Sequence, residues 1–78
     1  MQVLSGPSEY RFTVTGTAGP VKLSVMNAVG TVVAKLSGTA GRNGADLTWE
    51  YGSMRRGVYL YSVETPSGQV AGKLTIIR

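Results

Sequence analysis

The sequence contains no cysteine and no histidine among its 78 residues. Disulfide bonds, thiol nucleophiles, thiolate or imidazole metal ligands and the usual general base of enzymes are therefore excluded. The lack of cysteine does not establish a reducing compartment, because secreted bacterial domains also fold without disulfides. The composition thus argues against catalysis and leaves the compartment open.

Acidic residues are few, with four Asp and Glu against eight Lys and Arg, so the formal net charge is +4. The basic residues are scattered, and Arg55 and Arg56 form their single cluster. Nucleic-acid-binding domains instead concentrate basic residues in a stripe, so we expect no nucleic-acid partner. No apolar run is long enough to cross a membrane or to form the core of a signal peptide. We therefore expect a chain that does not span a membrane.

A helical period of 3.6 residues persists nowhere along the chain, because glycine and proline interrupt it. Apolar and polar residues alternate instead, as they do in strands with one buried face. The alternating segments are residues 10–15, 21–26, 31–36, 45–49, 58–65 and 69–77.

The segments between these strands are rich in glycine and proline. Residues 1–6 are expected to form a linker or an edge strand, and glycine-rich residues 37–44 an exposed, mobile loop. Short strands at intervals of about 8 to 12 residues with glycine turns are typical of a β-sandwich. We predict an all-β fold, a small antiparallel immunoglobulin-like or fibronectin III-like β-sandwich of about seven strands with no long helix. Residues 7–78 would form this single domain.

Two hairpin turns can be assigned from their residues. In the last one, Pro66 presets φ at the second turn position and Gly68 permits a positive φ, which indicates a type I turn closed by a bulge. The same kind of turn is expected at residues 27–30, where Asn27 offers an acceptor side chain and Gly30 ends the turn.

The aromatic residues have two interpretations. Tyr59 follows Gly57 near the start of a central strand, where β-sandwich domains place a tyrosine whose hydroxyl bonds to the backbone at a corner, and we predict this role. Trp49, Tyr51 and Tyr61 could form a platform for sugar rings. However, a tryptophan on the inward side of a strand in so small a core favours packing over ligand contact.

No group of residues predicts a catalytic site. Asp46 and Glu50 lie four residues apart on one strand face, about 13 Å from each other, which is too far for cooperation across a glycosidase cleft. The sequence also lacks phosphate-binding loops, nucleophile elbows and metal-ligand spacings. We therefore expect no enzyme activity, no cofactor and no metal.

One set of residues recurs in a recognisable order along residues 7–78. It consists of Asn27, Gly30, Trp49, Gly57, Tyr59, Gly68, Lys73 and the final Ile76, Ile77 and Arg78. In this order of motifs, the chain resembles the C-terminal sorting domains of the type IX secretion system of Bacteroidetes. It is also similar to the related immunoglobulin-like domains of the flagellar hook-capping type.

Two positions depart from the family pattern. Trp49, Glu50, Tyr51 and Gly52 stand where the hook-capping relatives have Trp-Asp-Gly. Gly6 and Pro7 stand where a sorting domain often begins with Asn-Pro.

The resemblance implies a non-catalytic C-terminal domain of a larger secreted bacterial protein, which serves as a sorting signal for the outer-membrane type IX translocon. Its partners would be translocon proteins and the upstream domain of the parent chain. The parent would be secreted or held at the cell surface after passing through the periplasm. The implied recognition residues are Gly68, Lys73, Ile76, Ile77 and Arg78, and the implied structural residues are Gly30, Trp49, Gly57 and Tyr59.

An alternative function comes from a different class. The domain would then be an immunoglobulin-like spacer or a carbohydrate-binding accessory module of an extracellular enzyme, with a polysaccharide as the ligand in the second case.

Overall fold

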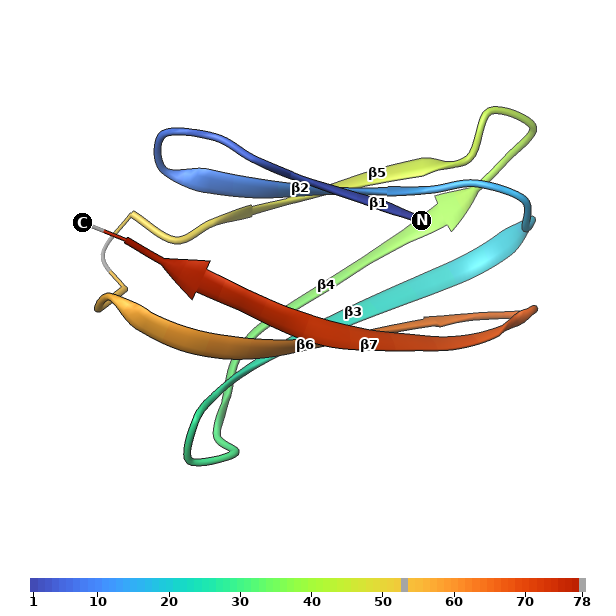
Figure 1. Cartoon of the computed structure of the whole chain (residues 1–78). Coiled ribbons are helices and arrows are strands. Elements are labelled where there is room, and N and C mark those ends of the chain that lie inside the picture. Colours follow the sequence, from blue (N-terminus) through green and yellow to red (C-terminus); the bar gives the residue numbers. More distant parts are fainter. Residues whose placement is uncertain (53, 78) are drawn as a thin grey trace.

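The computed structural model describes residues 1–52 and 54–77, which form seven strands in two layers (Figure 1). The strands are β1 (Gln2–Ser5), β2 (Glu9–Val14), β3 (Gly19–Asn27), β4 (Val32–Ala40), β5 (Ala45–Glu50), β6 (Gly57–Thr65) and β7 (Gly68–Ile76). One sheet has the order β1-β2-β5 and the other β4-β3-β6-β7, and every pairing is antiparallel. The protein is therefore the small all-β sandwich of immunoglobulin-like or fibronectin III-like character that the alternating pattern predicts. The described residues contain no helix, and so none that could cross a membrane.

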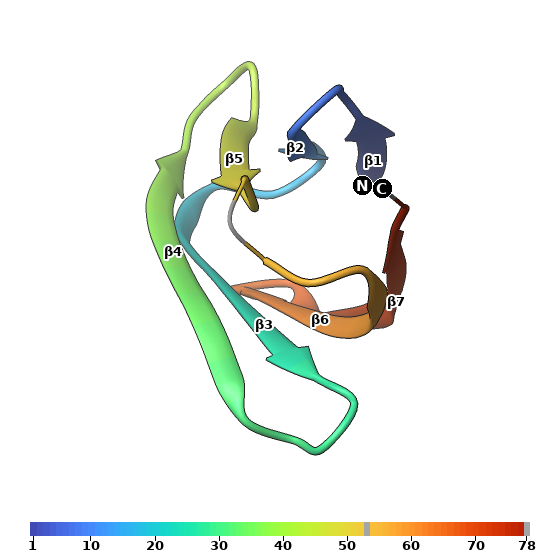
Figure 2. The same cartoon turned by 90° about the vertical axis from the view of Figure 1, so that its left-hand side faces the viewer.

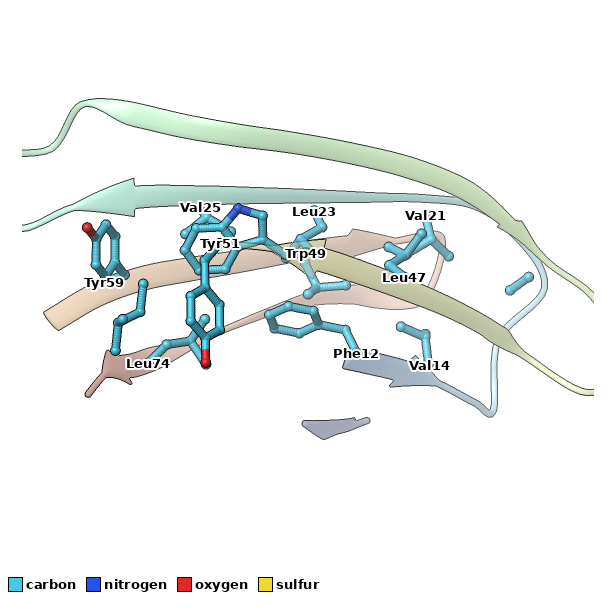
Figure 3. Packing of buried hydrophobic residues seen from close by; sticks show 13 residues of the cluster. Phe12, Val14, Val21, Leu23, Val25, Leu47, Trp49, Tyr51, Tyr59 and Leu74 are labelled. Carbon is cyan, nitrogen blue, oxygen red and sulfur yellow. The ribbon is translucent and has the colours of Figure 1, made fainter. Parts of the chain in front are cut away.

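Alternate residues of both sheets point inward and fill the core between the layers (Figure 3). The most deeply buried side chains are Phe12, Val21, Leu23, Val25, Val63 and Ile76. Burial of an apolar side chain of this size contributes about 1.5–3 kcal/mol. The period-2 pattern in the sequence therefore reflects the main source of the stability of the fold.

Residues 37–44 differ from the sequence-based prediction of an exposed loop. β4 continues through Ala40, which is 3% exposed and pairs with Gly19. The prediction was wrong for residues 37–40, because β3 begins two residues before its apolar run and so offers this segment a partner. Gly38 is a site of close packing, since a Cβ there would lie 3.1 Å from Cδ2 of Leu47. The chain reverses only at the Gly41↔Gly44 bridge.

The β3–β4 turn forms as its residues predict. The Oδ1 atom of Asn27 accepts hydrogen bonds from the backbone N–H groups of Val29 and Thr31, both at 3.0 Å. The N–H of Gly30 donates to the carbonyl of Asn27 at 3.0 Å, and Gly30 has a φ of +97°. The side chain of Asn27 thus holds the turn that Gly30 completes.

The β6–β7 turn is tighter than predicted. Pro66 and Ser67 form a two-residue loop, and Gly68 after it has a φ of +140°. Primed turns require a positive φ at a central residue of the turn. They are excluded here, because no non-glycine residue among those described has a positive φ. The positive φ of Gly68 is confirmed. The predicted bulge is absent, because β6 and β7 pair in unbroken register up to Thr65↔Gly68.

Residues 1–6, for which the sequence left a linker and an edge strand open, contribute β1 at the edge of the smaller sheet. Its four residues pair with β2 from Gln2↔Thr13 to Ser5↔Tyr10. β1 thus belongs to the sandwich, which extends the folded domain beyond the predicted start at residue 7.

Tyr59 has the predicted corner role. Its side chain is 7% exposed, and its hydroxyl donates to the backbone carbonyl of Arg55 at 2.8 Å. Gly57, between them, has a φ of +150° and begins β6. The bond therefore fixes the path by which the chain approaches this strand.

We expect Tyr59→Phe to lower the free energy of unfolding by about 1–2 kcal/mol, because the part-buried Arg55 carbonyl loses its donor. Tyr61→Phe is the matched control, since it removes the same atom from the same strand and its hydroxyl makes no hydrogen bond among the described residues. Urea unfolding measures both variants. Equal losses would show that the corner bond adds nothing specific. Tyr51 is unsuitable as the control, because it is buried and its hydroxyl donates to the Gly6 carbonyl at 3.3 Å.

Candidate functional site

The implied recognition residues gather on β7, an edge strand of the larger sheet (Figure 1). Gly68 begins the strand, Lys73 lies within it, Ile76 ends it and Ile77 follows it directly. Arg78 lies outside the described residues. The structure thus brings four of the five residues to one strand and its end.

These four residues present different surfaces. The side chain of Lys73 is exposed on the outer face of the sheet, and Ile77 is 84% exposed. Ile76 is only 1% exposed and packs in the core, so in the folded domain its side chain is not accessible to a partner. Gly68 shapes the turn through its positive φ. Lys73 and Ile77 are therefore the members of the set whose side chains a partner could contact.

β7 also presents backbone groups at its outer side. In a two-residue hairpin the residues that flank the loop form a hydrogen-bonded pair, so Gly68 directs its peptide groups toward β6. The alternation along a strand then directs those of Gln69, Ala71, Lys73 and Thr75 away from β6. An independent contact agrees, because the hydroxyl of Tyr10 on β2 donates to the carbonyl of Thr75. From Gln69 to Lys73, no hydrogen bond from the described residues covers this outer edge.

β1 and β7 are edge strands on the same side of the sandwich, one in each layer (Figure 2). Two polar contacts lie on this side of the sandwich. The Tyr10 hydroxyl reaches Thr75 near one end, and Oγ of Ser67 donates to Oγ1 of Thr17 at 2.9 Å near the other. A hollow of ≈ 250 Å³ lies at the β6–β7 turn, and Val70, which is 47% exposed, lines it. The other apolar residues that line the hollow are Met1, Val14 and Val63.

Gly72 lies in the middle of β7 under the ring of Tyr61 from β6. A Cβ at this position would lie 2.5 Å from the hydroxyl oxygen of Tyr61 and 2.6 Å from its Cζ. The same ring packs edge-on against Phe12, with a centroid distance of 5.2 Å. The close approach at Gly72 was not predicted, although a glycine inside a strand pattern is itself a signal of such an approach.

Trp49 and Tyr51 pack inside the sandwich and do not contribute to a surface platform for sugar rings. Trp49 is 5% and Tyr51 is 7% exposed, and both belong to the core (Figure 3). The Trp49 ring lies 5.7 Å from that of Tyr51 and 5.7 Å from that of Tyr59, centroid to centroid. The predicted packing of Trp49 is confirmed, and of the three residues of the carbohydrate alternative only Tyr61 remains partly exposed.

Asp46 and Glu50 lie on one face of their strand, as the sequence predicts, and this face is exposed. Oγ1 of Thr13 donates to Oδ1 of Asp46 at 2.9 Å. Within residues 1–52 and 54–77, no group of three potential ligands could hold a metal ion.

In comparisons with known proteins, the chain matches no protein-family model and no curated protein sequence.

We expect Gly72→Ala to lower the free energy of unfolding by about 1–3 kcal/mol, because the new methyl group forces the Tyr61 ring away from both β7 and Phe12. Gly41→Ala is the control, since a Cβ there meets nothing within 4 Å and its φ is not positive. Chemical unfolding compares the variants. A loss at Gly41 as large as that at Gly72 would contradict the steric explanation.

Proposed function

We propose that the domain is the sorting signal of a larger secreted bacterial protein, read by an outer-membrane translocon of type IX. The resemblance in the order of the motifs motivates the proposal. The observation that carries it is the position of Lys73 and Ile77 on and beside an edge strand whose outer backbone groups from Gln69 to Lys73 are not covered by the described residues. The domain itself carries out no reaction in this proposal.

An exposed strand edge suits recognition of a signal in an extended conformation. In β-strand addition, backbone hydrogen bonds supply affinity and alternate side chains supply specificity. Lys73 on β7 offers a positive charge, and Ile77 just beyond the strand offers an apolar side chain, while buried Ile76 anchors the strand end between them. A partner could therefore bind the edge without unfolding the sandwich.

The proposed partners are the translocon proteins and the upstream domain of the parent chain. The parent would reach the outside or the cell surface through the periplasm. The alternative is a passive immunoglobulin-like spacer, for which the state of the β7 edge would be irrelevant.

The proposal is tested by fusing residues 1–78 behind a signal peptide and a reporter. The whole segment is needed because β1 is part of the sandwich. We expect the reporter outside type IX-competent cells and in the periplasm of a translocon mutant, as measured by fractionation. Equal export from both strains would contradict the sorting proposal and leave the spacer alternative.

Lys73→Ala separates recognition from folding in the same assay. Since the side chain is exposed, we expect a change of less than about 0.5 kcal/mol in the free energy of unfolding. Export should nevertheless fall several-fold. Lys35→Ala, which removes an exposed lysine from β4 at the opposite edge of the sheet, should leave export unchanged. Equal effects of the two variants would contradict recognition at β7.

A further inference from the structure

We propose that β7 pairs with β7 of a second copy of this chain, antiparallel and about a two-fold axis at Ala71. The two four-stranded sheets would then join into one continuous sheet. The inference rests on the geometry of the strand edge and not on the proposed function.

β7 differs from the other edge strands in having a long and regular free side. Its outer side is uncovered from Gln69 to Lys73, five residues in unbroken register, whereas β1 has four residues in all. β4 at the opposite edge is interrupted by a register shift beside Val25 and Met26, and it contacts β5. β7 has no proline and one charged residue, Lys73, although natural edge strands commonly use such residues against pairing. It is therefore the edge on which strand addition meets the least obstruction.

One register satisfies the free backbone groups. The residues whose groups point away from β6 are Gln69, Ala71, Lys73 and Thr75, and the carbonyl of Thr75 already accepts from Tyr10. An axis at Ala71 places Ala71 opposite its own copy and Gln69 opposite Lys73, so only uncovered groups are used.

The neighbouring registers each meet an obstacle. An axis at Lys73 would oppose two lysines, which is unfavourable in a cross-strand pair. An axis at Gly72 would place Gln69 opposite Thr75, whose carbonyl is occupied. An axis at Val70 would place Lys73 opposite Ser67 in the turn, and an axis at Gln69 would run further into the turn at Pro66 and Ser67. The edge is thus self-complementary about Ala71.

The side chains also fit this register. On the inner face, Val70 of one copy would lie opposite Gly72 of the other. This is a non-hydrogen-bonded pair, in which the two Cα atoms lie about 4.5 Å apart. The Tyr61 ring covers Gly72, so the half-exposed Val70 would meet that ring in a contact of the β-branched and aromatic type. On the outer face, the Gln69 amide oxygen would accept from Lys73. Because the contact is isologous, each of these interactions forms twice.

The chain has no cysteine, so single cysteine variants test the register without background. Across the axis, two Ala71 Cα atoms would lie about 5.5 Å apart, within the range of disulfides. Ala71→Cys should therefore form a disulfide-linked dimer under mild oxidation at high protein concentration. Lys73→Cys is the matched control, because two copies of this residue would be offset by about 13 Å along the strands. A Lys73→Cys dimer that forms as fast as the Ala71→Cys dimer overturns the register.

Sedimentation equilibrium tests the association without crosslinking. The wild-type chain should shift from monomer to dimer as its concentration rises. The shift should be larger at high salt, because each copy carries a net charge of +4 and salt screens the repulsion.

Ala71→Pro removes an N–H group that points away from β6. The hydrogen bonds between β7 and β6 therefore stay intact, while the pairing of the two copies loses two symmetric hydrogen bonds. Its dissociation constant should rise at least about tenfold with an unchanged circular dichroism spectrum. A wild-type chain that stays monomeric at millimolar concentration, or an Ala71→Pro variant that dimerises equally well, overturns the proposal.

Discussion

Four aromatic rings form one chain of contacts that connects the two sheets, and much of the structure depends on it. The rings of Tyr10 and Tyr51 lie 5.5 Å apart, and the chain continues through Trp49 to Tyr59 on the other sheet. Such ring pairs contribute about 0.5–1.5 kcal/mol each beyond their burial. The three tyrosine hydroxyls each donate to a backbone carbonyl, at Thr75, Gly6 and Arg55 respectively. Ring packing thus sets the position of the end of β7, the β1–β2 turn and the approach to β6.

The parts of the fold that follow from neighbouring residues were predictable from the sequence. Strand alternation is a pattern of adjacent residues, and the Asn27 turn and the Tyr59 corner each involve contacts over at most four residues. The parts that were missed depend on strands distant in sequence. Residues 37–40 are a strand because β3 lies beside them, and Tyr10 meets Thr75 across 65 positions. Alternation reveals which face of a strand is buried, but it does not reveal which strand lies next to it.

The candidate site shows the same limit. Alternation places Lys73 in solvent and Ile76 in the core, and the structure agrees. That β7 is an edge strand follows only from the strand order, so the exposed backbone of Gln69 to Lys73 could not be predicted locally. The two proposals for this edge also constrain each other. A translocon that pairs with β7 would compete with a second copy, so the dimer would have to dissociate before recognition.

The placement of the first and last strands has a mechanical consequence. In Figure 1 the start of β1 and the end of β7 point toward opposite ends of the sandwich, along the strand direction. Tension between these two points would pull β1 along β2 and β7 along β6, so that the hydrogen bonds of each ladder are stretched together in shear rather than peeled one at a time. The nine residue pairs between β6 and β7 would then resist the force as a group, so that the four pairs between β1 and β2 form the shorter ladder, which would yield first.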